Sequence, residues 1–169
     1  KQVSGYSQRR TEPDTDSVSL DILFPNGLQR ITDRNVKFAI GVDFEVQYRL
    51  AGSSTWLAAP LLGGAGGMII SGSVFTIAAN SKSAVRRSVW FTFPARGQYD
   101  VRIRRNTVDD QSDNTGQNQS VTVENSFWGA FRSFRNDAPV NRIGIARIAV
   151  RAQATDQLNG VIEQLNCTV

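Results

Sequence analysis

The segment from residue 36 to residue 50 reads VKFAIGVDFEVQYRL, and it decides the fold class. Every even position carries an apolar side chain, whereas the odd positions from Lys37 to Arg49 are polar, charged or small. A period of two places one face in a core and the other in solvent, which is the pattern of a β-strand and not of a helix. Because this is long for a single strand, Gly41 is the predicted place for a bulge or bend.

The same alternation recurs on both sides of this segment. Residues 18–24 are apolar at the even positions and end at the turn signal Pro25-Asn26-Gly27. Apolar and polar residues alternate again over 85–93 and over 99–104. Residues 121–134 are expected to hold a last strand that runs into a short aromatic connection, although their aromatic spacing also suits a short helix. The sequence therefore predicts an all-β fold built as an antiparallel β-sandwich.

The length of the chain suggests how it is divided. Residues 16–135 supply about the length of one sandwich of roughly 100 residues, so residues 1–15 are expected to be a leader or an edge strand. Residues 136–169 then remain as an additional C-terminal β-hairpin, with Asn159-Gly160 at its turn, and we expect it to belong to an adjoining domain. Since the sequence begins at Lys1 and contains neither a signal peptide nor a transmembrane run, it is expected to be a fragment.

Composition excludes several classes of function. The 169 residues contain no histidine and one cysteine, Cys167, so histidine-based catalysis, most zinc sites and an internal disulfide are all excluded. We therefore expect a protein that is not an enzyme and has no metal or cofactor. The net charge of +4, from 19 basic and 15 acidic residues, is too modest to predict a specific nucleic-acid binder.

The glycine-rich stretch at residues 63–67 is the first candidate site. A phosphate-binding loop would end in Gly-Lys-Ser/Thr, but Met68-Ile69-Ile70 follows here, so nucleotide binding is not predicted. The stretch could instead be a hairpin tip, at which Leu61, Leu62 and Met68 contact a partner or a membrane. The alternative is a flexible surface loop.

Three acidic residues form a second candidate. Asp109, Asp110 and Asp113 could gather around a calcium ion, which prefers several oxygen ligands. Their spacing lacks the glycine and the glutamate of an EF-hand loop. We therefore expect a solvated acidic loop and no metal site.

Arginines on neighbouring predicted strands form the third candidate. Arg86, together with Arg102 or Arg104, could make one outward stripe that meets a phosphate-rich polysaccharide or an acidic neighbouring chain. The alternative is a solvated strand face whose charge is neutralised by Asp43 and Glu45.

Two stretches, VDFEVQYRLAGSSTW and FPARGQYDVRIRR, resemble a fibronectin type III domain. The resemblance implies that Trp56 fills the core and that the hydroxyl of Tyr99 bonds back to the backbone in a tyrosine corner. The other residues predicted for this core are Phe44, Val46, Tyr48, Val101 and Ile103.

A more specific resemblance covers most of the chain. The stretches LDILFPNGL, SAVRRSVWFTFPARGQYDVRIRR and RIAVRAQATDQLNG look like the host-specificity protein J family of long-tailed phage tail tips. This implies a structural module of the tail tip or central fibre, located in the virion tail and encoded by a phage or a prophage. It also implies a homotrimer that meets other tail proteins during tail assembly and host attachment, with a bacterial surface receptor or polysaccharide as a further partner. The glycine-rich stretch at residues 63–67 is not part of this resemblance.

A second function fits the same fold. A carbohydrate-binding or adhesin β-sandwich on a bacterial surface would present aromatic side chains on a flat, exposed face. A structural module would bury its aromatic side chains or turn them toward another subunit. The position of the aromatic residues therefore discriminates between the two hypotheses.

Overall fold

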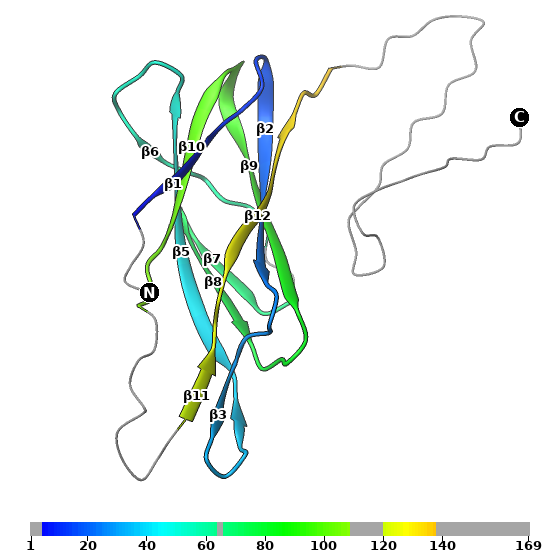
Figure 1. The fold of residues 1–169 in the computed structure, drawn as a ribbon. Coiled ribbons are helices and arrows are strands. Elements are labelled where there is room, and N and C mark those ends of the chain that lie inside the picture. The colour runs from blue at the N-terminus through cyan, green and yellow to red at the C-terminus, as the bar shows by residue number, and fades with distance from the viewer. Residues whose placement is uncertain (1–4, 64–65, 109–119, 138–169) are drawn as a thin grey trace, which may run out of the picture. The chain divides into compact units, whose positions relative to one another are not determined.

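The computed structural model describes residues 5–63, 66–108 and 120–137, and within them every regular element is a β-strand. The strands form three antiparallel sheets, which we number I to III (Figure 1). Sheet I has the order β1-β10-β5-β8-β7, with β6 beside β5; the bounds are β1 Ser7–Arg10, β10 Tyr99–Arg105, β5 Ile40–Leu50, β8 Val74–Ala79, β7 Met68–Ser71 and β6 Leu57–Ala58. The predicted all-β, antiparallel architecture is confirmed.

The other two sheets each have three strands. Sheet II has the order β12-β2-β9, with β12 at Phe127–Phe134, β2 at Thr15–Phe24 and β9 at Val85–Gly97. Sheet III has the order β11-β3-β4, with β11 at Ser120–Val123, β3 at Gln29–Thr32 and β4 at Lys37–Phe38. Residues 121–134 are thus strands and not a helix. The hairpin predicted for residues 136–169 lies, from residue 138 onward, outside the described residues.

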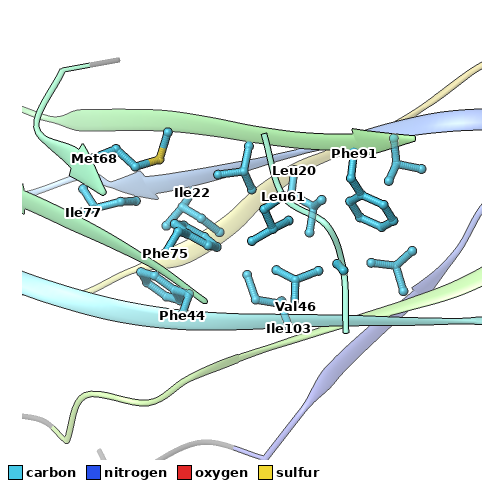
Figure 2. Close-up of a cluster of buried hydrophobic side chains, with 14 of the residues drawn as sticks. Leu20, Ile22, Phe44, Val46, Leu61, Met68, Phe75, Ile77, Phe91 and Ile103 are labelled. Atoms are coloured by element: carbon cyan, nitrogen blue, oxygen red, sulfur yellow. The ribbon is translucent and has the colours of Figure 1, made fainter. Parts of the chain in front are cut away.

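Sheets I and II enclose the core. Figure 2 shows Leu20 and Ile22 of β2 facing Phe44 and Val46 of β5 across it. The even-numbered residues from Val18 to Phe24 and from Val42 to Tyr48 point inward, as the alternation in the sequence predicted, because successive side chains of a strand alternate between its faces. Leu50, at the end of β5, is 54% exposed. The buried residues from these two strands are Val18, Leu20, Ile22, Phe24, Val42, Phe44, Val46 and Tyr48.

One end of the core is aromatic. The ring of Tyr99 stacks on Phe93 with 3.8 Å between the ring centroids, and Tyr48 packs edge-on against Phe93 at 5.5 Å. The hydroxyl of Tyr99 donates a hydrogen bond of 2.7 Å to the carbonyl of Ala95. This is the tyrosine corner that the resemblance to fibronectin type III domains implied.

The long segment 36–50 changes sheets, but not where the sequence suggested. The break falls at Ala39: β4 pairs with β3 in sheet III, whereas β5 pairs with β10 and β8 in sheet I. The predicted bend at Gly41 is wrong, because Gly41 lies inside β5, where an added Cβ would stand 3.1 Å from the Cγ2 of Thr76. Phe38 precedes the break and stays half exposed, because its strand has left the core.

The turn after β2 requires a glycine. The amide of Gly27 donates to the carbonyl of Phe24 at 3.2 Å, and Leu28 then exchanges backbone hydrogen bonds with Ser81. Gly27 has a φ of 90°, and an added Cβ would lie 2.2 Å from the carbonyl oxygen of Ser81. Both the positive φ and the close backbone contact exclude a side chain at this position.

The first and last described strands have exchanged their usual places. In the immunoglobulin-like order the first strand lies beside the second, and the last strand lies in the opposite sheet. Here β1 pairs with β10 and β12 pairs with β2. Arg9 of β1 donates a hydrogen bond of 3.0 Å to the carbonyl of Trp128 in β12, and its guanidinium lies 4.4 Å from the Trp128 ring centroid. The two strands therefore close the same side of the sandwich.

Candidate functional site: the arginine-bearing outer faces

The outer face of sheet I carries a ladder of polar cross-strand pairs. The outward residues of β10 stand directly opposite outward residues of β5, so that Asp100 faces Arg49, Arg102 faces Gln47 and Arg104 faces Glu45. Directly opposite residues on one face are close enough for their side chains to interact. We call this surface the arginine face and define it by Tyr6, Arg10, Glu45, Gln47, Arg49, Trp56, Asp100, Arg102 and Arg104.

A buried carboxylate holds one end of the arginine face. Asp100 is fully buried, although it points away from the core, because two arginines cover it. The Nε atoms of Arg10 and Arg49 donate to it at 2.7 Å and 3.1 Å, which joins β1, β10 and β5. The hydrogen bond from Arg10 holds the pKa of Asp100 below its ordinary value, against the opposing effect of burial, and Arg49 lowers it further.

Arg102 occupies the middle of the face. Its guanidinium lies 4.0 Å from the ring centroid of Tyr6 and 4.0 Å from that of Trp56. Its Nε donates to the side-chain oxygen of Gln47 at 3.0 Å, and a second donor of the guanidinium reaches the same oxygen. In the described part of the chain, no carboxylate forms an ion pair with Arg102. Cation–π contacts and a neutral amide therefore fix a guanidinium whose charge is not cancelled.

The third cross-strand pair of the arginine face, Arg104 and Glu45, carries no net charge. Arg104 and Glu45 form an ion pair of 2.6 Å, which bears out one of the two carboxylates that the sequence suggested for this role. Burial alone would raise the pKa of Glu45, but the hydrogen bonds from Arg104 and Gln47 outweigh it and lower that pKa. Asp43, the other suggested carboxylate, accepts a hydrogen bond of 2.6 Å from Thr76 and not from an arginine.

The arginine face as a whole has a surplus of positive charge. Its four guanidinium groups are matched by the carboxylates of Asp100 and Glu45 only, which leaves two positive charges. One of these charges is that of Arg102, and the other remains where Arg10 and Arg49 share Asp100, since Arg104 is paired with Glu45. The face is therefore suited to a ligand or a partner with negative charge.

Arg86 lies on the opposite side of the molecule from this face. It belongs to β9 in sheet II, whereas Arg102 and Arg104 belong to β10 in sheet I, so the predicted stripe of Arg86 with Arg102 or Arg104 is wrong. Period-two alternation shows which side of its own strand a residue occupies, but not which sheet the strand joins. Arg86 instead forms an ion pair with Asp21.

Asp21 is the counterpart of Asp100 on the outer face of sheet II. Its side chain is buried, and it accepts hydrogen bonds from Arg86, from the hydroxyl of Ser88 at 2.7 Å and from Arg132 at 2.8 Å. Burial would raise the pKa of Asp21, but these three donors outweigh it and hold the pKa below its ordinary value. Each sandwich sheet is thus braced from outside by one carboxylate between two arginines.

Two residues predicted as interaction sites belong to the core. Leu61 and Met68 flank the glycine-rich stretch, and they are buried among Phe75, Ile77 and their neighbours (Figure 2). The prediction of an interaction role for them is wrong, because the chain turns inward on both sides of the stretch. Leu62 is 53% exposed and exchanges backbone hydrogen bonds with Trp90, so this connection passes from sheet I to the edge of sheet II.

Trp56 also differs from the prediction. The other predicted core residues are buried, namely Tyr99, Phe44, Val46, Tyr48, Val101 and Ile103. Trp56 is only partly buried and lies on the outer face, where its ring contacts Arg49 and Arg102. Tyr6, Arg10 and Asp21 were not singled out from the sequence; Asp21 alternates with the apolar residues of its strand, and no local pattern marks Tyr6 or Arg10.

Asp109, Asp110 and Asp113 lie outside the described residues. Among residues 5–63, 66–108 and 120–137, no group of three or more potential metal ligands comes together. The same residues include no helix that is long and apolar enough to cross a membrane.

Sandwich, tyrosine corner and aromatic core together define the class of protein, a fibronectin type III-like β-sandwich module. A family model described as tip attachment protein J, FNIII-A domain, matches residues 1–137, and the chain belongs to this family. Comparison with curated proteins and with solved structures gave no match. Family membership gives the chain a structural role at the tip of a phage tail, located in the virion tail and associated with other tail components.

Proposed function

We propose that the chain is an architectural module that connects neighbouring parts of the tail-tip protein during tail assembly and host attachment. In the full-length protein it belongs to a homotrimer, as the resemblance to the protein J family implies, and it is encoded by a phage or a prophage. The module keeps its neighbours at a fixed separation while the tail tip is pressed against the bacterial surface. The way in which the chain enters and leaves the sandwich supports this proposal.

The chain enters the sandwich through β1 and leaves it through β12. Both strands run toward the end of the sandwich that holds Tyr99, since Arg10 pairs with Asp100 there and Phe134 pairs with Ser17. A force that separates the two ends of the module therefore acts along both strands. Hydrogen bonds in an antiparallel ladder are perpendicular to the strands. All hydrogen bonds between β1 and β10, and all those between β12 and β2, therefore resist the force at the same time. The contact of Arg9 with Trp128 adds a link between the two strands.

A phage whose tail-tip gene contains this module provides the test of the role in assembly. Deletion of residues 7–10 removes β1, and we expect particles with incomplete tail tips under the electron microscope and a large loss of infectivity. The control is the substitution Arg34→Gln in the exposed turn between β3 and β4, which is expected to leave particles intact. Complete tails and normal infectivity after deletion of residues 1–137 would rule the architectural role out.

We further propose that the module has no catalytic activity. The chain contains no histidine, and the two aspartates that are buried among residues 5–63, 66–108 and 120–137, Asp21 and Asp100, each accept hydrogen bonds from two arginines that lower their pKa. Such carboxylates stay ionised at neutral pH and cannot serve as proton donors. The purified chain is therefore expected to give no turnover on glycans, peptides or nucleotides, and turnover that disappears on a single carboxylate substitution would contradict this.

The alternative of a carbohydrate-binding sandwich gains support from exposed aromatic residues. Seven aromatic residues of the described chain are buried in the core, but Trp90 of β9, Phe127 and Phe134 of β12 and Phe38 of β4 are between 43% and 59% exposed. These four rings are spread over two sheets, with β9 and β12 on opposite sides of β2. The arginine face offers a more specific contact with a glycan.

A further inference from the structure

One of the two uncancelled charges of the arginine face, that of Arg102, is held at a fixed position. Rings on two sides and the amide of Gln47 fix the guanidinium of Arg102, so little side-chain entropy remains to be lost when a ligand binds. A guanidinium has five N–H donors, and Gln47 engages the Nε and one terminal nitrogen. The other terminal nitrogen, Nη1, has no hydrogen-bond partner among the described residues and is available to a ligand.

The chemistry of this group selects the anion. A planar guanidinium with a free end matches two oxygens of a phosphate group, which it binds through paired, charge-assisted hydrogen bonds. Arg10 and Arg104 lie on either side of Arg102, and their side chains are 55% and 40% exposed. They add long-range attraction, although their own carboxylate partners already engage them.

The number of charges discriminates between possible polyanions. Nucleic acid presents a continuous row of phosphates, and proteins that bind it cluster more positive charge than the surplus of two found here. A protein partner would meet a charged centre, whereas the centres of protein interfaces are depleted of charge. A glycan that carries isolated phosphate groups requires one fixed guanidinium with a small surrounding surplus.

We propose that the arginine face binds the phosphate groups of an anionic bacterial surface polysaccharide, with Arg102 as the residue that contacts the phosphate. The inference rests on the proposed function in one respect, since a tail-tip module comes close to such a surface. Trp56 and Tyr6 act as positioning residues, because their rings contact the guanidinium of Arg102 and do not contact the phosphate themselves.

Binding of the complete 169-residue chain to phosphorylated lipopolysaccharide core oligosaccharide, measured by titration calorimetry, tests the proposal. The same oligosaccharide after chemical dephosphorylation is expected to bind about tenfold more weakly, in line with the loss of a charge-assisted hydrogen bond. Arg102→Gln should weaken binding of the phosphorylated form by a similar factor and leave the dephosphorylated form unaffected. Binding should also weaken as salt concentration rises.

Two variants separate the site from general charge effects. Arg34→Gln removes one positive charge from an exposed turn outside the arginine face and should retain the affinity of the unmodified chain. Trp56→Leu keeps all charges but removes one ring from Arg102, so it should weaken binding to the phosphorylated form only. Equal loss in Arg34→Gln and Arg102→Gln, equal affinity for the two oligosaccharides, or equal affinity for single-stranded DNA would overturn the proposal.

The outcome in the phage distinguishes this inference from the architectural role. Arg102→Gln phage should have complete tails and adsorb more slowly to cells with phosphorylated surface glycans. Incomplete tails in this variant would mean that the arginine face is an interface within the tail, which overturns the glycan site and leaves the architectural role intact. Normal tails after deletion of the module would overturn the architectural role. That outcome would not affect the glycan site, which calorimetry tests separately.

Discussion

A single carboxylate on the outer side of β2 holds three strands of sheet II together. Asp21 accepts hydrogen bonds from β9 through Arg86 and Ser88, and from β12 through Arg132. Its side chain is almost inaccessible to solvent, whereas the two arginines remain more than one third exposed. The two arginines can turn to solvent if they lose Asp21 as their partner. We therefore expect removal of the Asp21 charge to destabilise the fold by about 2 kcal/mol, which is less than the cost of breaking a fully buried ion pair.

The first prediction follows from the pKa of Asp21 and concerns acid stability. The folded-state pKa lies below the ordinary value of 3.8, so the contribution of the charge is fully present above that value. It is lost as the pH falls through the folded-state pKa. Urea unfolding at neutral pH and at steps downward from about pH 4 should show the stability falling in acid. Asp21→Asn should be less stable at neutral pH and should lose less on acidification, and an unchanged acid slope would contradict this assignment.

Glycine at the turn after β2 gives the second prediction. Gly27→Ala should destabilise the protein by about 3–5 kcal/mol, because it combines a positive φ with a collision against Ser81. Gly52→Ala is the matched control: its φ of 86° is nearly the same, but an added Cβ would meet nothing within 4 Å. This control should cost about 1 kcal/mol. Thermal unfolding of both variants measures the difference, and equal losses would show that the backbone contact at Gly27 is unimportant.

The tyrosine corner gives the third prediction. Tyr99→Phe keeps the stacked ring and removes the hydrogen bond to Ala95, so it should destabilise the fold by about 1 kcal/mol. Tyr48→Phe removes a hydroxyl from the same aromatic cluster, for which no hydrogen bond occurs within the described residues, and it should be close to neutral. Chemical denaturation compares the two, and a larger loss for Tyr48→Phe would contradict the role given to the corner.

At the scale of single elements, alternation in the sequence was sufficient to find the long strands and their inward faces. The residues of β2 and β5 that point to the core are the ones predicted from a period of two. What the sequence did not reveal was the sheet that each strand joins, because hydrogen-bonding partners lie far away in the chain. This accounts for the wrong stripe predicted with Arg86 and for the bend predicted at Gly41, whereas the break falls at Ala39. Trp56 was misplaced for a related reason, since a ring that packs on arginines has the same local signature as a core ring.

The fourth prediction concerns β1 as an element. Deletion of residues 1–10 leaves buried Asp100 with Arg49 as its one arginine partner and removes Tyr6 from Arg102. The free energy of unfolding should fall by about 3 kcal/mol, since a charge-assisted hydrogen bond and an edge ladder are lost together. Circular dichroism should still report β-structure, because the main core lies between other strands. A deletion without effect on the unfolding midpoint would mean that β1 is only a leader.

For the whole molecule, the family match and the described sandwich end at the same place. The match stops at residue 137, and β12 ends at Phe134. The fifth prediction is therefore that a chain truncated after residue 137 unfolds cooperatively at the temperature of the full chain. Sedimentation of both forms reports whether residues 138–169 are needed for association. A truncated chain that fails to fold would place those residues within the core and move our proposed boundary.

Exchange of the terminal strands has a consequence for how the chain folds. Pairing of Leu23 with Phe127 in sheet II and of Ser7 with Ile103 in sheet I joins residues that are far apart in the sequence. Contacts of such long range slow folding, because closing a long segment of chain into a loop costs conformational entropy before the contact stabilises it. One edge of β2 therefore stays open on the ribosome until β12 has been synthesised, and an open edge pairs readily with another chain. If several copies are made close together, β12 is the described strand most exposed to exchange between them, and the speed of its docking decides whether each copy closes on itself.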